Sequence, residues 1–313
     1  MGAGNIAHNF CDAVDQLKNC QVVAVASKSM ERAQRFAKEN SILKAYDSYE
    51  TMLREEQIDC VYIAVTPNDH FRLSMLCLDY KMPVLCEKAM FLNSRDAKKV
   101  FDRSEEEGVF VMEALWSRFL SAVIKARDWV LDGKIGRVRL LDVVLGFRAP
   151  ENPENRYYSR ALGGGVSHDL TVYAYEIGKF FLDAQEQNRD VQAVFGDTGV
   201  DLTNHISMTV GEVMVSLTTS MAVDVDNRLV LYGDRGRIVI PHPHYGNDAF
   251  LYTNGEKPVL MFHDETENGF VYEIREVINC IRQGKIESPV VPHNLTLACS
   301  EVFDEIETAA QYG

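Results

Sequence analysis

The sequence predicts an α/β protein in which a Rossmann-type, doubly wound parallel sheet precedes a C-terminal α/β domain with a large open, mostly antiparallel sheet. Three observations predict this fold class. Residues 2–7 read G-x-G-x-x-A, the phosphate turn of dinucleotide-binding folds. Short apolar runs at 21–26, 60–65 and 83–86 alternate with helical patterns, as in βαβ units. After residue 137, strand-like runs are longer and alternate between apolar and polar residues, which is typical of an open sheet.

The glycine turn comes first in the chain. Gly2 permits the tight turn, Gly4 lets the backbone approach a pyrophosphate, and Ala7 lets the next helix pack close to the sheet. We expect that helix at about residues 5–15, with its positive N-terminus directed at the anion. The residues predicted to bind the cofactor here are Gly2, Gly4, Asn5 and Ile6.

A buried strand normally precedes such a turn, whereas this sequence begins on the turn itself. An empty central position in the sheet would expose apolar flanks and unpaired backbone groups. A start codon assigned too late is the simpler explanation. We therefore expect the first strand to be missing here and to belong to a longer natural protein.

The next elements follow from residue periodicity. Continuous apolar, β-branched runs predict buried parallel strands, and apolar residues at helical spacing predict the connecting helices. The domain boundary is predicted near Met112, with an NADP-binding domain at 1–112 and a substrate-binding and dimerisation domain at 113–313, whose last helix can pack back on the first. In chain order we expect a strand at 21–26, helix 30–39, strand 60–65, helix 72–80, strands 83–86 and 109–112, and alternating strands at 137–147, 205–210, 213–219, 228–232 and 237–240.

Composition narrows the classes of function. The chain has 313 residues and a formal net charge of −14, which argues against binding to nucleic acid or to an anionic membrane surface. No apolar run approaches the roughly 20 residues of a membrane helix, and no signal peptide is visible. The seven cysteines are scattered and odd in number, so we expect reduced thiols in a cytoplasmic protein. No His/Cys/carboxylate cluster has ligand spacing, so no metal site is expected.

The residues after the strand at 21–26 bear on the choice of cofactor. NAD-selective sites usually place a carboxylate there, which bonds the ribose hydroxyls. This sequence has Ser27 and Lys28 instead, with Arg32 on the following helix. A hydroxyl and two cations suit a 2′-phosphate, so we favour NADP(H) over NAD(H), although use of both stays open. The alternative is that Lys28 and Arg32 are only solvated surface charges.

Lys88 is a candidate acid–base group. It follows Glu87 at the carboxyl end of a buried strand, where doubly wound folds bind their ligands. Its ammonium would donate to a substrate hydroxyl and relay a proton. Partial burial and a neighbouring positive nicotinamide ring would depress its pKa toward working pH. An exposed Glu–Lys loop pair would have the same sequence.

A second candidate group follows three glycines at 163–165. Asp169 and Tyr173 are four residues apart, so they lie on one face of the expected helix. Tyr173 would exchange the substrate proton, and Asp169 would orient the substrate or Lys88. The alternative is a glycine-rich helix start with Tyr173 packed in the core. His168 points about 100° away from Asp169 and is expected to be structural.

Several motifs, in this order, resemble those of the Gfo/Idh/MocA oxidoreductases over nearly the whole chain. They are the glycine turn, T-P-N at 66–68 with His70, C-E-K at 86–88, E-A-L-W-S-R-F at 113–119 and the glycine-rich segment at 163–173. Within that family the sequence is most similar to the group of trans-1,2-dihydrobenzene-1,2-diol dehydrogenases and NADP D-xylose dehydrogenases.

The resemblance implies reversible hydride transfer between nicotinamide C4 and a carbon of a sugar, polyol or vicinal diol. It implies a homodimer formed through the sheet of the second domain, and it implies Lys88, Asp169 and Tyr173 as the catalytic residues. Further cofactor-binding positions are Thr66, Pro67, Asn68, His70, Glu87, Trp116 and Arg118. The substrate pocket is expected to depend on Trp116, Phe119, Arg156 and Tyr158.

The sequence departs from the family at Ala89, where relatives have proline. A cis bond costs roughly 2.5–4 kcal/mol before alanine, against about 0.5–1 before proline. The loop therefore either adopts cis at this bond or directs Lys88 with a trans backbone. The alternative function is an NADP-sensing regulatory protein of the same fold without turnover. The joint presence of Lys88, Asp169 and Tyr173 argues against that alternative.

Overall fold

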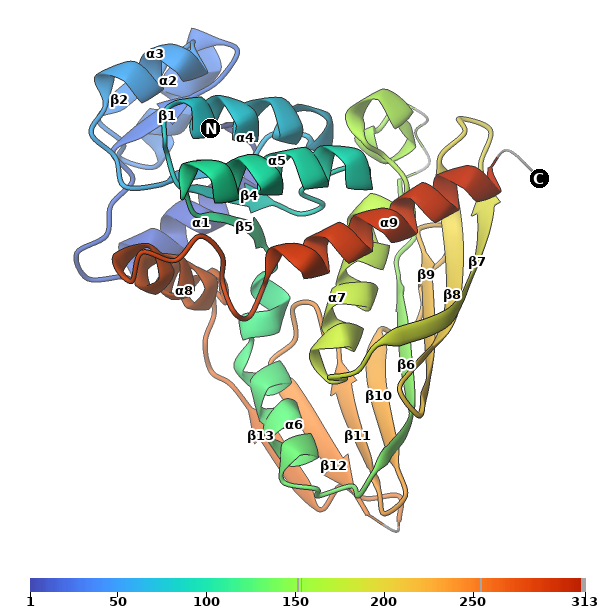
Figure 1. Ribbon diagram of the computed structural model, residues 1–313. Helices are drawn as coiled ribbons and strands as arrows, with labels where there is room; N and C mark the ends of the chain where they lie inside the picture. The colour runs from blue at the N-terminus through green and yellow to red at the C-terminus, as the bar shows by residue number, and fades with distance from the viewer. Residues whose placement is uncertain (151, 153, 254, 311–313) are drawn as a thin grey trace. The chain divides into compact units, whose positions relative to one another are not determined.

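The chain folds into two compact units, which separate short parallel strands from a large mixed sheet (Figure 1). The computed structural model describes residues 1–150, 152, 154–253 and 255–310. Unit 1 comprises Met1–Ala114 and Asn268–Leu297, and unit 2 comprises Leu115–Glu267 and the chain from Ala298 onward. The first unit therefore ends two residues after the predicted boundary. It also includes a later segment that the prediction placed in the second domain.

Unit 1 alternates short strands and helices. Local capping defines several helix starts, because the side chains of Ser29, Ser48 and Asn93 each accept a hydrogen bond from the backbone N–H three residues later. The elements are α1 (Asn5–Asp15), β1 (Ala24–Ala26), α2 (Met30–Glu39), β2 (Lys44–Tyr46), α3 (Tyr49–Glu55), β3 (Val61–Ile63), α4 (His70–Asp79), β4 (Val84–Glu87), α5 (Ser94–Glu107), β5 (Val111–Ala114) and α8 (Phe270–Arg282).

The parallel strands of unit 1 form two separate sheets, β1–β2 and β3–β4–β5. Met1 and Gly2 lie between them. The Met1 amino group donates to Tyr62 O at 2.6 Å, Ala64 N–H donates to Met1 O at 2.8 Å, and Gly2 N–H donates to Ala26 O at 2.8 Å. These two residues therefore occupy one end of the strand position that the sequence predicts to be empty.

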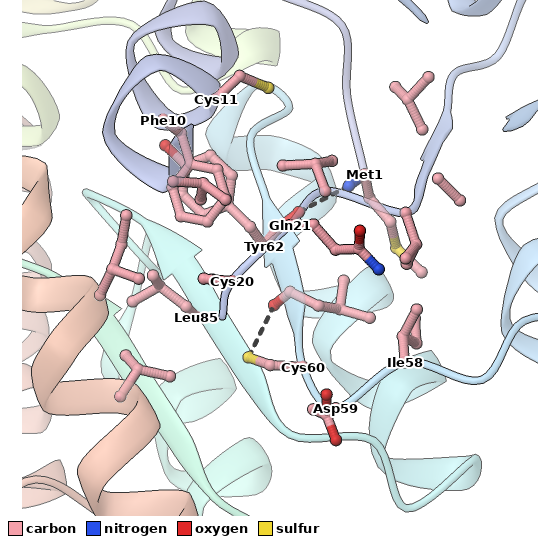
Figure 2. Close-up of a pocket in the computed structure, with 18 of the residues that line it drawn as sticks. Met1, Phe10, Cys11, Cys20, Gln21, Ile58, Asp59, Cys60, Tyr62 and Leu85 are labelled. Atoms are coloured by element: carbon pink, nitrogen blue, oxygen red, sulfur yellow. Dashed lines mark hydrogen bonds between the residues drawn. The ribbon is translucent and has the colours of Figure 1, made fainter. Parts of the chain in front are cut away.

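An apolar cavity of about 610 Å³ continues from Met1 between the two sheets (Figure 2). Residues 21–25 and 57–62 flank it, and Leu85 and side chains of α8 also line it. The ring of Phe10 stacks on that of Tyr62 beside the cavity, with centroids 3.8 Å apart. The cavity lies where the side chains and backbone of a central strand would lie in a continuous parallel sheet.

Unit 2 is built on an eight-stranded mixed sheet with the order β13-β12-β11-β10-β6-β9-β8-β7 (Figure 1). β6 and β9 pair in parallel, and the other described pairs are antiparallel. This confirms the predicted fold class. The strands are β6 (Val138–Gly146), β7 (Glu186–Phe195), β8 (Asp201–Val210), β9 (Val213–Ser220), β10 (Arg228–Gly233), β11 (Arg237–Pro241), β12 (Asp248–Tyr252) and β13 (Leu260–His263).

One face of this sheet packs against α6 (Ser121–Leu131) and α7 (Val172–Phe180). Alternate residues of β6, such as Leu141 and Val143, point to that face and are fully buried. Residues that point the other way include Leu140 and Met214, which pair across β6 and β9 and are 36% and 53% exposed. The last helix, α9 (His293–Ala309), begins in unit 1 and ends in unit 2.

Candidate active site

Gly2 and Gly4 form the turn that the sequence assigns to the pyrophosphate. Gly2 has a φ of +100°, and a Cβ added to it would lie 2.4 Å from Ala64 O, so a larger residue does not fit. A Cβ on Gly4 would lie no closer than 4.0 Å to that oxygen. Gly4 caps α1 without a side chain, and the first turn, with Asn5 and Ile6 exposed, has no acidic residue. These N–H groups fit an anion such as a dinucleotide pyrophosphate.

The predicted 2′-phosphate contacts have different environments. Ser27 is buried, whereas Lys28 and Arg32 are exposed. Lys28 Nζ lies 2.5 Å from Asp69 Oδ2, and Arg72 Nε lies 3.4 Å from Asp69 Oδ1. Burial acts to raise the pKa of Asp69, but Lys28 and Arg72 outweigh it and hold that pKa below its usual range. Sequence analysis missed this carboxylate, although Asp69 directly follows the T-P-N motif.

The T-P-N motif forms the loop after β3, and His70 follows it at the start of α4. His70 is fully buried, with Nδ1 3.0 Å from Ala89 O and Nε2 3.0 Å from Val65 O. Each ring nitrogen faces a backbone carbonyl, so the His70 side chain lies between the loops that carry Val65 and Ala89, and its predicted contact with the cofactor stays a prediction. Of the motif itself, Thr66 and Pro67 are partly buried and Asn68 is exposed.

Lys88 lies directly after β4, and the peptide bond between Lys88 and Ala89 is cis. The first of the two predicted alternatives is therefore the observed one. Glu87 is buried, and its carboxylate accepts hydrogen bonds from the Tyr62 hydroxyl and, at 3.2 Å, from Lys88 N–H. Burial raises the pKa of Glu87. In this structure Glu87, a predicted cofactor contact, anchors the start of the loop at residues 88–93, between β4 and α5, which we call the lysine loop.

In unit 2 the candidate tyrosine is held by a tryptophan. Trp116 Nε1 donates to the Tyr173 hydroxyl at 3.0 Å, and Tyr173 is 8% exposed. The ring of His244 lies 5.5 Å from that of Tyr173, centroid to centroid. Sequence analysis predicted both Trp116 and Tyr173 as site residues but not His244. The fold therefore joins two predicted site residues that are 57 positions apart.

Asp169 lies in a π-helical turn, Ser167–Thr171, that precedes α7, where the sequence predicts a regular helix. Asp201 is buried and accepts hydrogen bonds from the N–H of Ser167 at 2.7 Å and from its hydroxyl at 3.0 Å. Asp201 thereby fixes the start of the turn. The Asp169 carboxylate lies 3.5 Å from a guanidinium nitrogen of Arg156, so a predicted catalytic acid pairs with a predicted substrate residue. Single π-turns of this kind are frequent at functional sites.

Arg118 has a different place from the predicted one. Its guanidinium is 3.8 Å from the Glu176 carboxylate, stacks 4.7 Å from the Phe180 ring, and has 6% of its side chain exposed. Burial lowers the pKa of Arg118 to about 10, although Glu176 acts in the opposite direction. In this structure the Arg118 guanidinium packs against α7 through Glu176 and Phe180, and its predicted contact with the cofactor stays a prediction.

The remaining predicted residues of unit 2 are more peripheral to these contacts. Phe119 and Tyr158 are partly buried. The ring of His168 packs edge-on against Phe303 at 4.8 Å, and its Nδ1 lies 3.3 Å from Gly164 O, which is a structural environment.

A metal site or a membrane-spanning helix would each indicate a different class of protein. Within the described ranges, no group of three or more His, Cys, Asp or Glu side chains has a geometry that could hold a metal ion. No helix in the part of the chain that the structure describes has both the length and the apolar character needed to cross a bilayer.

Comparison with known proteins places this geometry in a family. Residues 1–115 match the model of an oxidoreductase family with an NAD-binding Rossmann fold, and residues 123–239 match the GFO/IDH/MocA C-terminal domain. The chain is 34% identical to trans-1,2-dihydrobenzene-1,2-diol dehydrogenase of Mus musculus, over 98% of this chain and 93% of that protein. The protein of the same name from Danio rerio is 30% identical, over 97% and 93%.

Solved structures agree on the fold. An aldose–aldose oxidoreductase from Caulobacter crescentus, in complex with glycerol, superposes with a TM-score of 0.87 at 20% identity, covering 100% of this chain and 96% of that one. A 3-ketoreductase from Actinomadura kijaniata, in complex with NADP, gives 0.85 at 21% identity, covering 98% and 95%. Levoglucosan dehydrogenase in complex with NADH gives 0.88 at 14% identity, covering 99% and 96%. On the matches to both domains and to a full-length relative, the chain belongs to the Gfo/Idh/MocA family of NAD-binding oxidoreductases.

Proposed function

We propose that the protein is an NADP-dependent dehydrogenase or reductase that moves a hydride between nicotinamide C4 and a CH–OH carbon of a vicinal diol, polyol or sugar. The observation that carries the proposal is the hydrogen bond from Trp116 to Tyr173. Indole N–H is a donor only, so the Tyr173 oxygen is the acceptor, and its own proton is directed elsewhere. A phenol held in this way suits proton exchange with a substrate hydroxyl.

The bound nicotinamide supplies the hydride acceptor or donor, and the chain supplies position and protons. Tyr173 as phenolate takes the hydroxyl proton during oxidation, and as phenol returns it during reduction. Lys88 donates a hydrogen bond to a substrate oxygen and stabilises the negative charge that develops on it. Asp169, which the structure pairs with Arg156, orients the neighbouring hydroxyl of the substrate.

The choice of NADP over NAD rests on the residues after β1. Lys28 and Arg72 are more than half exposed, and Arg32 adds a third cation at the start of α2. These cations suit a 2′-phosphate. The carboxylate of Asp69 between Lys28 and Arg72 has the opposite preference, since it can bond a ribose hydroxyl and repels a phosphate. We therefore propose that NADP(H) is preferred and that NAD(H) is also accepted.

The substrate class is proposed from the relatives and from the site. The similar mouse and zebrafish proteins are named for a vicinal diol, and the structural neighbours for sugars. Hydroxyl-rich substrates need several hydrogen-bonding groups in one place, which Asp169, Arg156 and Tyr173 can supply. Trp116 and Phe119 offer flat apolar surface for a ring.

We also propose a homodimer formed through the outer face of the unit 2 sheet. Apolar side chains recur there in register across neighbouring strands, because Leu140 pairs with Met214 and with Tyr232. These three residues are 36%, 53% and 39% exposed. Contiguous exposed apolar side chains of this kind usually mark an interaction surface. A cytoplasmic location fits the seven cysteines, all within the described residues and all free thiols.

The test is a substrate screen with both cofactors. Purified protein is mixed with NADP or NAD and with trans-1,2-dihydrobenzene-1,2-diol, D-xylose and other sugars or diols, and absorbance at 340 nm is followed. We expect turnover with at least one substrate, faster with NADP. Lys88→Met should lower kcat about 10²–10⁴-fold, and Lys98→Met, on the exposed face of α5, should not change it. Binding of NADPH without turnover of any compound would favour the sensing regulator and overturn the proposal.

A further inference from the structure

Unit 1 buries a carboxyl group that the proposed reaction does not use. Glu113 lies in β5 and is 2% exposed. Its Oε1 accepts a hydrogen bond from Met90 N–H at 2.9 Å, and its Oε2 accepts one from the Thr296 hydroxyl at 2.8 Å. A buried carboxyl with both oxygens engaged is unusual in a structural core, because burying a charge is costly unless it is paired. One of its two contacts, that with Met90, is to the loop that carries Lys88, and the other is to α9.

The lysine loop is held at both polar atoms of one peptide group, the one that joins Ala89 to Met90. Glu113 holds the N–H of Met90, and His70 lies 3.0 Å from the carbonyl oxygen of Ala89. Both supporting side chains are buried, and both residues of the loop that they contact are fully buried. The backbone immediately after Lys88 therefore has little freedom, and the direction of the lysine side chain depends on these two contacts.

We propose that Glu113 is a positioning residue for Lys88, acting through Met90 N–H and through the charge of its carboxylate. The inference rests on the proposed role of Lys88. An ionised acceptor binds the Met90 N–H more strongly than a neutral one. Charge attraction between Lys88 and the carboxylate acts to lower the pKa of Glu113, so the two groups interact through space. The loop is thus held more firmly when Glu113 is a carboxylate.

The ionisation of Glu113 falls in the neutral range. Burial raises the pKa of Glu113 to about 7, against the hydrogen bonds from Met90 and Thr296, which lower it. Of the charged neighbours, Glu87 raises this pKa and Lys88 lowers it. The other titratable groups at the loop and next to β5 include Cys86, which pairs with Glu113 across β4 and β5, His70, on Ala89 O, and His293, whose Nε2 lies 2.9 Å from Val111 O. Burial raises the pKa of the Cys86 thiol well above its usual value, so this thiol stays protonated where Glu113 titrates. Burial lowers the pKa of both histidines, so they are neutral where Glu113 titrates.

Two variants separate the effect of the Glu113 charge from that of the size of its side chain. Glu113→Gln keeps the size of the side chain and an oxygen for Met90 N–H, but it cannot ionise. Thr296→Val keeps the carboxyl and removes one hydrogen bond to it, which should move the titration of Glu113 to higher pH. Glu106→Gln, on an exposed position of α5, is the matched control for a lost glutamate charge.

The decisive measurement reads Lys88 directly and needs no turnover. Lysines of the full-length protein are converted to ¹³C-dimethyl-lysine, which keeps the positive charge, and the Lys88 signal is assigned by its loss in Lys88→Arg. We expect its chemical shift to show an inflection near pH 7 in the wild type and in Glu106→Gln, at higher pH in Thr296→Val, and none in Glu113→Gln. A wild-type signal without this inflection, or an inflection that survives in Glu113→Gln, overturns the proposal. The wild-type and Thr296→Val titrations decide the matter if Glu113→Gln does not fold.

Kinetic measurements give a second test, in which failure of the positioning proposal can be distinguished from failure of the proposed function. With a substrate found in the screen, Glu113→Gln should lower kcat about five- to tenfold, the usual difference between a charged and a neutral hydrogen bond, while KM for NADP stays within about twofold. An equal rise in KM for NADP would indicate general disruption of unit 1 and count against positioning. If no substrate is turned over by the wild type, the proposed function fails, whereas the NMR titration still tests the coupling of Glu113 to Lys88.

Discussion

The indole of Trp116 donates a hydrogen bond of 3.0 Å to the hydroxyl of Tyr173, so the phenol of the candidate site has a fixed direction before any substrate binds. Tyr173→Phe removes the proton that this arrangement presents. We expect kcat to fall about 10²–10⁴-fold, the usual contribution of a general acid–base group, with NADPH affinity unchanged by fluorescence titration. Tyr232→Phe, on the exposed outer sheet face, is the control. Near-normal kcat in Tyr173→Phe would remove Tyr173 from the mechanism.

Asp69 should set the balance between the two cofactors. Asp69→Asn removes a negative charge beside Lys28 and Arg72, so both cations become available to a 2′-phosphate. We expect the ratio of the Kd for NADH to the Kd for NADPH to rise about five- to tenfold, an effect on the order of 1 kcal/mol for charges near a protein surface. The exposed Asp12→Asn serves as control. If the ratio stays the same in direct binding measurements, Asp69 does not contact the ribose end of the cofactor.

The contribution of Glu113 to the stability of the protein should fall as pH rises toward neutrality. Glu113 has its pKa raised from 4.5 to about 7 by burial, so the folded state holds this proton more tightly than the unfolded state. Its contribution is fully present below about pH 4.5 and is lost by pH 7, on the order of 3 kcal/mol in the free energy of unfolding. Glu87 and Glu273, whose pKa values are also raised by burial, act in the same direction.

Urea unfolding between pH 5 and pH 8 measures this effect. Glu113→Gln should flatten the pH dependence, because an amide has no proton to lose. A stability that rises through this range with the same slope in wild type and variant would contradict the assignment of Glu113 as the titrating group.

The cavity between β1 and β3 should accept a strand. An extension of about five apolar, mostly β-branched residues ahead of Met1 would continue the backbone pairs that Met1 and Gly2 make. Each Val or Ile that becomes fully buried contributes about 1.5–3 kcal/mol, so the melting temperature should rise by several degrees. The extension would also replace the buried amino group of Met1, whose pKa is lowered to about 6 by burial, with a neutral peptide group. A Gly-Ser extension of equal length is the control, and equal melting temperatures would show that the cavity does not take a strand.

The outer face of the unit 2 sheet should hold the dimer together. Leu140→Asp and Met214→Glu place charges at paired positions of β6 and β9, where burial against a second copy would be costly. Light scattering after gel filtration should show a shift from dimer to monomer. Leu131→Glu, at the exposed end of α6, should stay dimeric. A wild type that is monomeric at micromolar concentration would refute the interface.

Local patterns predicted local structure well. The bounds of α1 and α2 agree with the expected ones, because a glycine cap and the Ser29 cap define their starts within the sequence itself. β2 was not predicted, since three residues with an exposed lysine carry no strand signal. β7 alternates with charged residues and was also missed. Both are edge strands, which form by pairing with the neighbouring strand and not by the propensity of their own residues.

The site residues that belong to a sequence motif could be predicted, whereas contacts between residues far apart in the chain could not. The turn at Gly2 and the candidate Lys88 could be found by motif alone. The pairing of Asp69 with Lys28 joins residues 41 positions apart, and that of Glu113 with Met90 joins residues 23 apart. Neither pair has a sequence signal, because tertiary packing brings the partners together.

The imidazole of His70 touches the carbonyl of Val65 on one side and the carbonyl of Ala89 on the other. The ring therefore fills the space between the ends of β3 and β4, and its single N–H donates to one of these two carbonyls. A ligand that displaced the T-P-N segment would also move the His70 ring and, with it, the peptide group between Ala89 and Met90. Ligand binding at one loop would thereby change the direction of the Lys88 amine on the other.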